Sequence, residues 1–246
     1  MRALSASDLL DAWELGAVQS PAQRALTLLA AACPEAGEDE LAALAVGRRD
    51  RGLLMLREIL FGPALAVLAL CPACGASLEA QVLISDLADP TSPPPSATPH
   101  ETSVDGYRVT FRLPASRDLA SMSPTDAPAV LRHRLLTLCV LEARDESGAV
   151  VSVDALPAPV VAGIAGAMAA ADPGADVQLD LTCAACAHRW PAVFDIAAVL
   201  WREINAWAER TLREVHGLAQ AYGWREADVL ALSPTRRQVY LELSRS

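Results

Sequence analysis

Two pairs of cysteines, Cys71-Pro-Ala-Cys74 and Cys183-Ala-Ala-Cys186, constrain the fold of this chain more than any other sequence feature. Zinc prefers four ligands in a tetrahedron, and a Cys-x-x-Cys turn, here called a knuckle, places two sulfurs on one side of it. Two knuckles complete the ligand shell. We therefore predict that Cys71, Cys74, Cys183 and Cys186 together bind one structural Zn²⁺ ion.

The two knuckles are far apart in the chain, with 108 residues between Cys74 and Cys183. Ordinary zinc ribbons have roughly 15–20 residues at this place. The intervening chain must therefore form a folded unit that leaves the ribbon and returns to the same place.

The predicted fold class is α+β and mostly helical: a zinc-ribbon-like four-cysteine module has a long folded insert between its knuckles and is flanked by N- and C-terminal helices. Hydrophobic residues make up 52% of the chain and aromatic residues only 4%, which favours closely packed helices rich in Ala, Leu and Val. The predicted regions are an N-terminal helical region (1–65), the ribbon module (66–87 and 176–195), an α/β insert (88–175) with a proline-rich loop at 89–99, and a C-terminal helical region (196–246).

Sequence patterns place strands next to the knuckles and helices at both ends of the chain. Strands are predicted at 79–87, 107–113, 177–182 and 188–193. Helices are predicted near 39–46 and over 49–60, 128–141 and 157–171, with one long helix from 195 to 223. Ser20-Pro21 is typical of a helix start. Within the long helix, Glu203, Arg210 and Glu214 are candidates for ion pairs along the helix.

Other roles for the cysteines stay open. They could be unrelated buried thiols, a ribbon that has lost its metal, or a thioredoxin-like redox pair. A redox pair needs Cys-x-x-Cys to open a helix, whereas strand residues follow both knuckles here. His188 could replace a cysteine as a ligand, but we expect it to be a packing neighbour. A catalytic zinc keeps one open coordination position, which four thiolates do not leave.

Charge and motifs argue against several classes of function. The formal net charge is −10 and the arginines are scattered, so the basic field that nucleic-acid binding requires is missing. The sequence contains no Gly-rich phosphate loop, no nucleophile elbow and no His-Glu-x-x-His motif. We expect no enzyme activity, no small-molecule substrate and no nucleic-acid partner.

We also expect a cytoplasmic protein without a membrane partner. The first residues lack the apolar segment of a secretory signal. The apolar runs are shorter than the roughly 20 residues that cross a bilayer.

Aromatic and arginine side chains in the C-terminal region are the candidates for a partner surface, because such side chains are favoured in protein interfaces. The candidate partner-binding residues are Trp201, Trp224, Arg236, Arg237 and Tyr240.

Several stretches carry a resemblance that covers nearly the whole chain. They are Val46-Gly-Arg-Arg-Asp50, Leu56-Arg-Glu-Ile-Leu-Phe-Gly62, the knuckle Cys-Pro-Ala-Cys-Gly, Gly106-Tyr-Arg-Val-Thr-Phe-Arg-Leu-Pro114, the second knuckle with Phe194-Asp-Ile196, and the ending 222–243. In these stretches the chain resembles the T4-type bacteriophage base plate family, the baseplate hub assembly chaperones of contractile phages and of phage-derived contractile injection systems. The ending is also similar to that of tail assembly chaperones.

The resemblance implies a non-enzymatic assembly chaperone or structural component of the baseplate or hub of a contractile tail-like particle. Such a particle is a phage tail or a contractile injection system. Its other baseplate, hub or tail proteins would be the partners. The cysteines alone leave two alternatives: a zinc-ribbon regulatory protein that binds nucleic acid, which the net charge opposes, and a thiol-disulfide enzyme.

Overall fold

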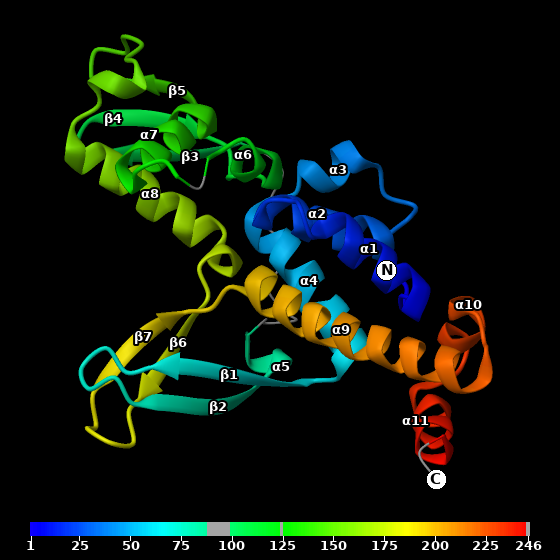
Figure 1. Ribbon diagram of the computed structural model, residues 1–246. Coiled ribbons are helices and arrows are strands. Elements are labelled where there is room, and N and C mark those ends of the chain that lie inside the picture. Colours follow the sequence, from blue (N-terminus) through cyan, green and yellow to red (C-terminus); the bar gives the residue numbers. More distant parts are fainter. Residues whose placement is uncertain (88–98, 124, 245–246) are drawn as a thin grey trace.

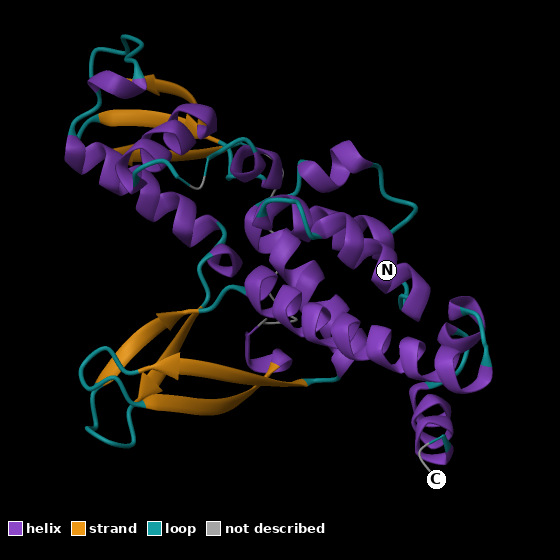
Figure 2. Ribbon diagram, viewed as in Figure 1, coloured by secondary structure: helices purple, strands orange, loops and turns teal. Residues whose placement is uncertain are grey.

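The computed structural model describes residues 1–87, 99–123 and 125–244. A helical body carries two extensions (Figure 1): the insert lies on one side of it, and two β-hairpins lie on another. Helices dominate, and the described strands belong to the two hairpins and to a small sheet in the insert (Figure 2). The predicted α+β, mostly helical class is confirmed, together with the long insert and the flanking helices.

Four helices begin the body: α1 (Ala6–Gly16), α2 (Pro21–Ala32), α3 (Glu38–Ala42) and α4 (Val46–Phe61). The predicted start of α2 is confirmed, because the Ser20 hydroxyl accepts the Gln23 amide and the Gln23 side chain accepts the Ser20 amide. The helix predicted near 39–46 is shorter and ends at Ala42. Helix α4 ends at Gly62, whose φ of +87° suits glycine.

The main hydrophobic core lies between these helices and α9 (Ile196–Tyr222). Its fully buried residues include Leu28, Leu53, Leu56, Leu200 and Ile204.

Two ion pairs join α9 to neighbouring helices instead of forming within α9 as predicted. Arg57 of α4 donates two hydrogen bonds to the Glu203 carboxylate, at 2.8 and 2.9 Å. Arg237 donates from Nε to Glu214 at 2.7 Å. The two acidic side chains reach adjacent helices, because buried guanidinium groups there need a partner more than exposed arginines do.

Two antiparallel hairpins carry the knuckles. Strand β1 (Ala64–Leu70) pairs with β2 (Ser77–Leu83), and β6 (Gln178–Thr182) pairs with β7 (Arg189–Val193). The strands predicted at 177–182 and 188–193 are confirmed to within one residue. The strand predicted at 79–87 ends early, because Ile84–Leu87 forms the short helix α5 and packs into the main core.

The insert is a small α/β unit with a core of its own. Its elements are β3 (His100–Val104), β4 (Tyr107–Phe111), α6 (Ser116–Ala120), α7 (Pro128–Cys139), β5 (Val140–Arg144), a 3-10 turn at Val153–Ala155, α8 (Ala158–Ala171) and a second 3-10 turn at Pro173–Ala175. The antiparallel sheet has the order β3-β4-β5. Its core consists of Val109, Leu136, Ala143, Leu156, Val160 and Ile164.

Parts of the insert differ from the predicted elements. The helix predicted over 128–141 ends at Cys139, because Val140–Arg144 pairs with β4 as an additional strand. The strand predicted at 107–113 ends at Phe111. The proline-rich loop predicted at 89–99 lies outside the described residues up to residue 98.

Asp172 ties the end of the insert back to the body. Its carboxylate, 3% exposed, accepts the backbone amide of Gly47 at 2.9 Å in the first turn of α4. The cap residue of that helix, Ala45, has no side-chain acceptor. A carboxylate from the far end of the insert therefore supplies the missing cap.

The long helix begins and ends as predicted. Asp195 caps it by accepting the Ala198 amide, and Gly223 ends it with φ of +67°. Two short helices, α10 (Glu226–Leu230) and α11 (Pro234–Leu243), then pack against the end of α9. Within the described part of the chain, no helix has both the length and the hydrophobicity that crossing a bilayer requires.

Candidate metal centre

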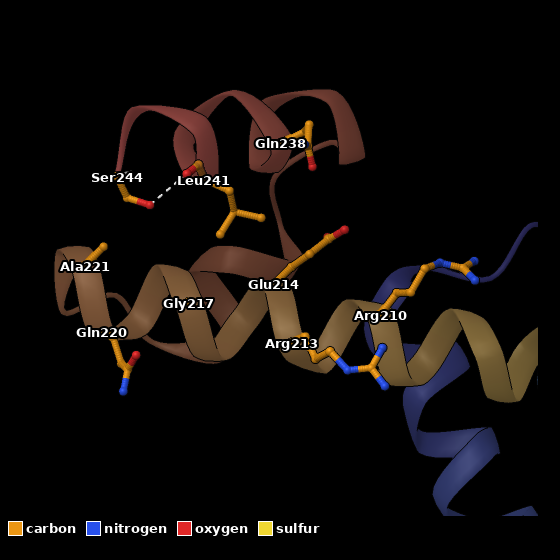
Figure 3. A pocket seen from close by; sticks show the side chains of 9 residues that line it. All are labelled: Arg210, Arg213, Glu214, Gly217, Gln220, Ala221, Gln238, Leu241 and Ser244. Atoms are coloured by element: carbon orange, nitrogen blue, oxygen red, sulfur yellow. Dashed lines mark hydrogen bonds between the residues drawn. The ribbon is translucent and has the colours of Figure 1, made fainter. Parts of the chain in front are cut away.

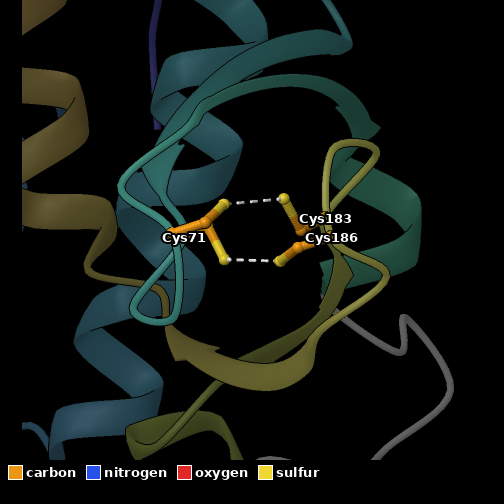
Figure 4. Close-up of side chains that lie close together, drawn as sticks. Cys71, Cys183 and Cys186 are labelled. Carbon is orange, nitrogen blue, oxygen red and sulfur yellow. Dashed lines mark hydrogen bonds between the residues drawn. The ribbon is translucent and has the colours of Figure 1, made fainter.

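The tips of the two hairpins meet and bring the four knuckle cysteines together. The Sγ atoms of Cys71, Cys74, Cys183 and Cys186 all lie within 4.8 Å of one another. Each sulfur of one hairpin has a close neighbour on the other, with Cys71 at 3.6 Å from Cys186 and Cys74 at 3.6 Å from Cys183 (Figure 4). Residues separated by the whole insert thus form one cluster.

The spacing of the sulfurs fits a tetrahedral zinc site. A Zn–S bond of about 2.3 Å gives a tetrahedron whose S–S edges are about 3.8 Å, close to the two distances of 3.6 Å. A disulfide is about 2.05 Å long, and all four cysteines are free thiols. The cluster could therefore hold a metal ion such as zinc.

Both knuckles form the same turn. The amide of Gly75 donates to the Cys71 carbonyl, and the amide of Ala187 donates to the Cys183 carbonyl, each at 2.9 Å. The residue after the second cysteine has positive φ in both turns, +71° at Gly75 and +59° at Ala187. The first knuckle uses the residue suited to this conformation, whereas the second uses an alanine.

Backbone amides of the knuckles donate to the sulfurs. The amide of Cys186, followed by that of Ala185, lowers the pKa of the Cys183 thiol to about 7. The His188 amide lowers the pKa of the Cys186 thiol, but the neighbouring Cys74 thiol and burial raise it to about 12. The hydrogen bonds between the neighbouring thiols thus lower the pKa of Cys183 and raise the pKa of Cys186.

Each knuckle has one buried and one accessible sulfur. Cys71 and Cys183 are 2% and 1% exposed, whereas Cys74 and Cys186 are exposed. The buried member of each pair lies next to its strand and anchors the turn. A metal ion here would lie at the surface of the module, held from the inside by two fixed thiols.

His188 is not part of the cluster in the described structure. Its ring stacks on Trp190, with the ring centroids 5.9 Å apart. Its backbone carbonyl accepts the Cys183 amide at 2.9 Å. His188 thus lies beside the four-cysteine cluster in the described structure.

Four of the five predicted partner-binding residues fall into three environments. Trp201 is half-buried beneath the guanidinium of Arg24, 4.6 Å from its ring centroid. The rings of Trp224 and Tyr240 pack edge to face, with their centroids 4.9 Å apart. Arg236 is exposed. These residues do not form one surface patch.

Arg237 is the exception that requires a correction. It is 3% exposed, and its guanidinium donates to Glu214 and to the Leu232 carbonyl. A side chain so enclosed supports the packing of α11 on α9 and is not available to a partner. Tyr222 was missed by the sequence prediction, although it stacks on Trp224 at 4.8 Å and is 38% exposed.

An open pocket of about 540 Å³ lies between α9 and α11 (Figure 3). Arg210, Arg213 and Glu214 line it from α9, and Gln238 and Leu241 line it from α11. No sequence motif predicts this pocket, because it arises from the packing of two helices.

Comparison with protein-family models, with curated proteins and with solved structures finds no match to this chain. The candidate site therefore rests on the positions and chemistry of the four cysteines.

Proposed function

We propose that this chain is a non-enzymatic protein stapled by a structural zinc ion, and that it acts as an assembly chaperone or structural component of the baseplate or hub of a contractile tail-like particle. The observation that carries the structural part is the convergence of the four sulfurs from two distant hairpins. The particle and its partners, other baseplate, hub or tail proteins, are supported by the resemblance in 46–62, 106–114 and 222–243.

The number and type of donors favour a structural over a catalytic role for the metal. Four thiolates fill a tetrahedral shell, whereas a catalytic zinc leaves one position for water or substrate. The ion would instead join the first hairpin, which follows the N-terminal helices, to the second, which precedes α9.

Metal analysis tests the structural part. Protein purified without chelators is expected to contain one zinc ion per chain. Inductively coupled plasma mass spectrometry measures this zinc content. Cys183→Ser removes a ligand and is expected to lose the zinc. Cys33→Ser changes a cysteine outside the cluster and should keep it. Metal-free wild-type protein, or a folded Cys183→Ser variant with a full complement of zinc, would contradict the four-thiolate site.

A pull-down tests the proposed role. The tagged chain is expressed in cells that are assembling particles, and hub, spike or baseplate proteins are expected among the bound proteins. A tagged unrelated zinc-ribbon protein serves as the control. Recovery of none of these proteins, together with normal particles after deletion of the gene, would overturn the assembly role.

The charge on the hairpins disfavours the nucleic-acid alternative. The two hairpins carry Glu79, Asp180 and Arg189 as their charged residues, so they offer no basic stripe to a phosphate backbone. An electrophoretic shift assay checks this alternative. Salt-sensitive binding of DNA or RNA at micromolar protein would favour the regulator over the assembly protein.

A further inference from the structure

Strand β1 has one open edge. It pairs with β2 on one side, and no other described helix or strand runs along it. The register shows which backbone groups face the open side. The Pro63 carbonyl accepts the Ile84 amide, and the Cys71 amide donates to the Ala76 carbonyl. The backbone groups of the odd-numbered residues therefore bond to β2, and those of the even-numbered residues point to the open side. The free groups are the N–H and C=O of Ala64, Ala66, Leu68 and Leu70.

The exposed side chains of β1 are all apolar. Leu68 is 64% exposed and Leu70 is 71% exposed, and Ala64 and Ala66 are exposed beside them. The strand reads Ala-Leu-Ala-Val-Leu-Ala-Leu, without a charge, a polar group or a proline. Natural edge strands are usually protected by such residues or by bulges. This edge has no protection against pairing with another strand.

The order of large and small residues identifies the strand that fits. When β1 is aligned antiparallel with a second copy of itself about Val67, Leu70 of the second copy faces Ala64, and Leu68 of the second copy faces Ala66. On the other face, Leu65 lies opposite Ala69 of the second copy, but its side chain is fully buried in the core of its own chain, so the exposed face provides the side-chain contacts. Each exposed leucine, Leu68 and Leu70, therefore meets an alanine, so that large and small side chains alternate across the joint.

This alignment is also one that the free backbone groups permit. It places even-numbered residues opposite even-numbered residues, so the outward N–H and C=O groups of both copies meet. A shift by one residue would oppose outward groups with groups already bonded to β2. A shift by two residues shortens the paired region and sets either Ala66 or Leu68 opposite the same residue of the second copy.

We propose that β1 is a homodimerisation strand, through which two copies of this chain join by antiparallel β1–β1 pairing centred on Val67. The pairing makes a four-stranded sheet in the order β2-β1-β1-β2 around a twofold axis. Main-chain hydrogen bonds supply the attraction, and the Leu–Ala alternation specifies the register. Each copy carries a net charge of −10, so added salt strengthens the dimer by screening their repulsion.

Sedimentation equilibrium over micromolar to submillimolar protein tests the proposal. The zinc-loaded wild type is expected to be dimeric at the upper end. Ala66→Pro removes an outward N–H that β2 does not use, so it is expected to yield a folded monomer. Gln81→Pro is the matched control: Gln81 is the cross-strand partner of Ala66, and its N–H points to the opposite edge. This variant should still dimerise.

A charge exchange tests the register. Leu68→Lys brings two lysines near each other across the axis, and Ala66→Glu brings two glutamates together, so each variant alone is expected to be monomeric. Mixed one to one, they should form a heterodimer, because the new lysine faces the new glutamate. Zinc content is measured for every variant, which separates loss of pairing from loss of the metal site.

A wild type that stays monomeric over the whole concentration range overturns the proposal. A monomeric wild type whose β1 strand binds a different protein overturns it as well. So does a dimer that survives both Ala66→Pro and Leu68→Lys. If Ala66→Pro does not fold, Leu68→Lys and Ala66→Glu test the pairing in its place. A one-to-one mixture of these two variants that stays monomeric overturns the proposed register.

Discussion

Ala187 and Gly75 occupy equivalent positions in the two knuckles, but only Gly75 is suited to the left-handed backbone found there. A side chain in this region costs roughly 1–2 kcal/mol, and glycine's extra freedom in the unfolded chain offsets about 0.5–1 kcal/mol. Ala187→Gly is therefore expected to raise the free energy of unfolding of the zinc-loaded protein by about 0.5–1 kcal/mol. Urea titration measures the change.

The reverse substitution provides the internal comparison. Gly75→Ala introduces the same strain into the first knuckle and is expected to lower the stability by a similar amount. Ala185→Gly, in the same knuckle but without positive φ, should bring no gain. A loss of stability in Ala187→Gly would show that the two turns are not equivalent.

Arg57 is almost completely buried and joins three parts of the body. It is 3% exposed, pairs with Glu203 of α9 and donates to the Gly62 carbonyl at 2.6 Å. Arg57→Ala leaves both partners without a donor and is expected to cost about 2–4 kcal/mol of stability. Thermal or urea unfolding measures this loss.

A surface arginine gives the contrast. Arg213 pairs with Glu209 one turn earlier on the exposed side of α9, and Arg213→Ala should change the stability by no more than about 0.5 kcal/mol. If Arg57→Ala and Arg213→Ala lost similar amounts of stability, burial would not decide how much these ion pairs contribute to it.

Among the contacts between elements, the one between α4 and the end of the insert requires a glycine, Gly47, which has no side chain. A Cβ on Gly47 would overlap the Asp172 carboxylate and approach the Ala175 amide nitrogen to 2.9 Å. Gly47→Ala is expected to break the cap that Asp172 provides and to raise hydrogen exchange at 172–177. The affected amides can be followed by mass spectrometry.

Gly166 of α8 is the matched control for this substitution. A Cβ there meets nothing within 4 Å, and alanine is the better helix former by about 1 kcal/mol. Gly166→Ala should leave exchange at 172–177 unchanged or slower. Faster exchange in both variants would argue against a specific role for the Gly47–Asp172 contact.

The helices and strands were predictable where their causes are local. Ser20, Asp195 and Gly223 mark helix ends through their own side chains or backbone freedom. Strand β5 was missed because Val140 continues the apolar pattern of α7, and only pairing with β4 ends that helix at Cys139. Pairing partners that are distant in sequence leave little trace in a local pattern.

For the whole molecule, the metal site is expected to join the two hairpins without holding the insert together. The insert has its own core around Val109 and Ile164. Removing zinc with a chelator should therefore increase hydrogen exchange strongly at 71–76 and 183–188, while exchange in β4 and α8 changes little. Readdition of zinc should restore protection. Equal deprotection of the insert would mean that the metal stabilises the entire chain.

Local features of the sequence were enough to predict the candidate metal site and several helix ends. The two Cys-x-x-Cys turns identify the four sulfurs, the long separation between them predicts a folded insert, and caps such as Ser20 set helix starts. These features act within a few residues, or through a metal whose ligand preference is independent of the fold.

Most contacts between distant elements became known from the folded chain alone. It buries Arg57 and Arg237, excludes His188 from the cluster, caps α4 with Asp172 and leaves one edge of β1 open. Each of these results depends on elements that are far apart in sequence. The sequence does not show whether a neighbouring element covers a charged or apolar residue. Burial decides how much such a residue contributes to the free energy of folding.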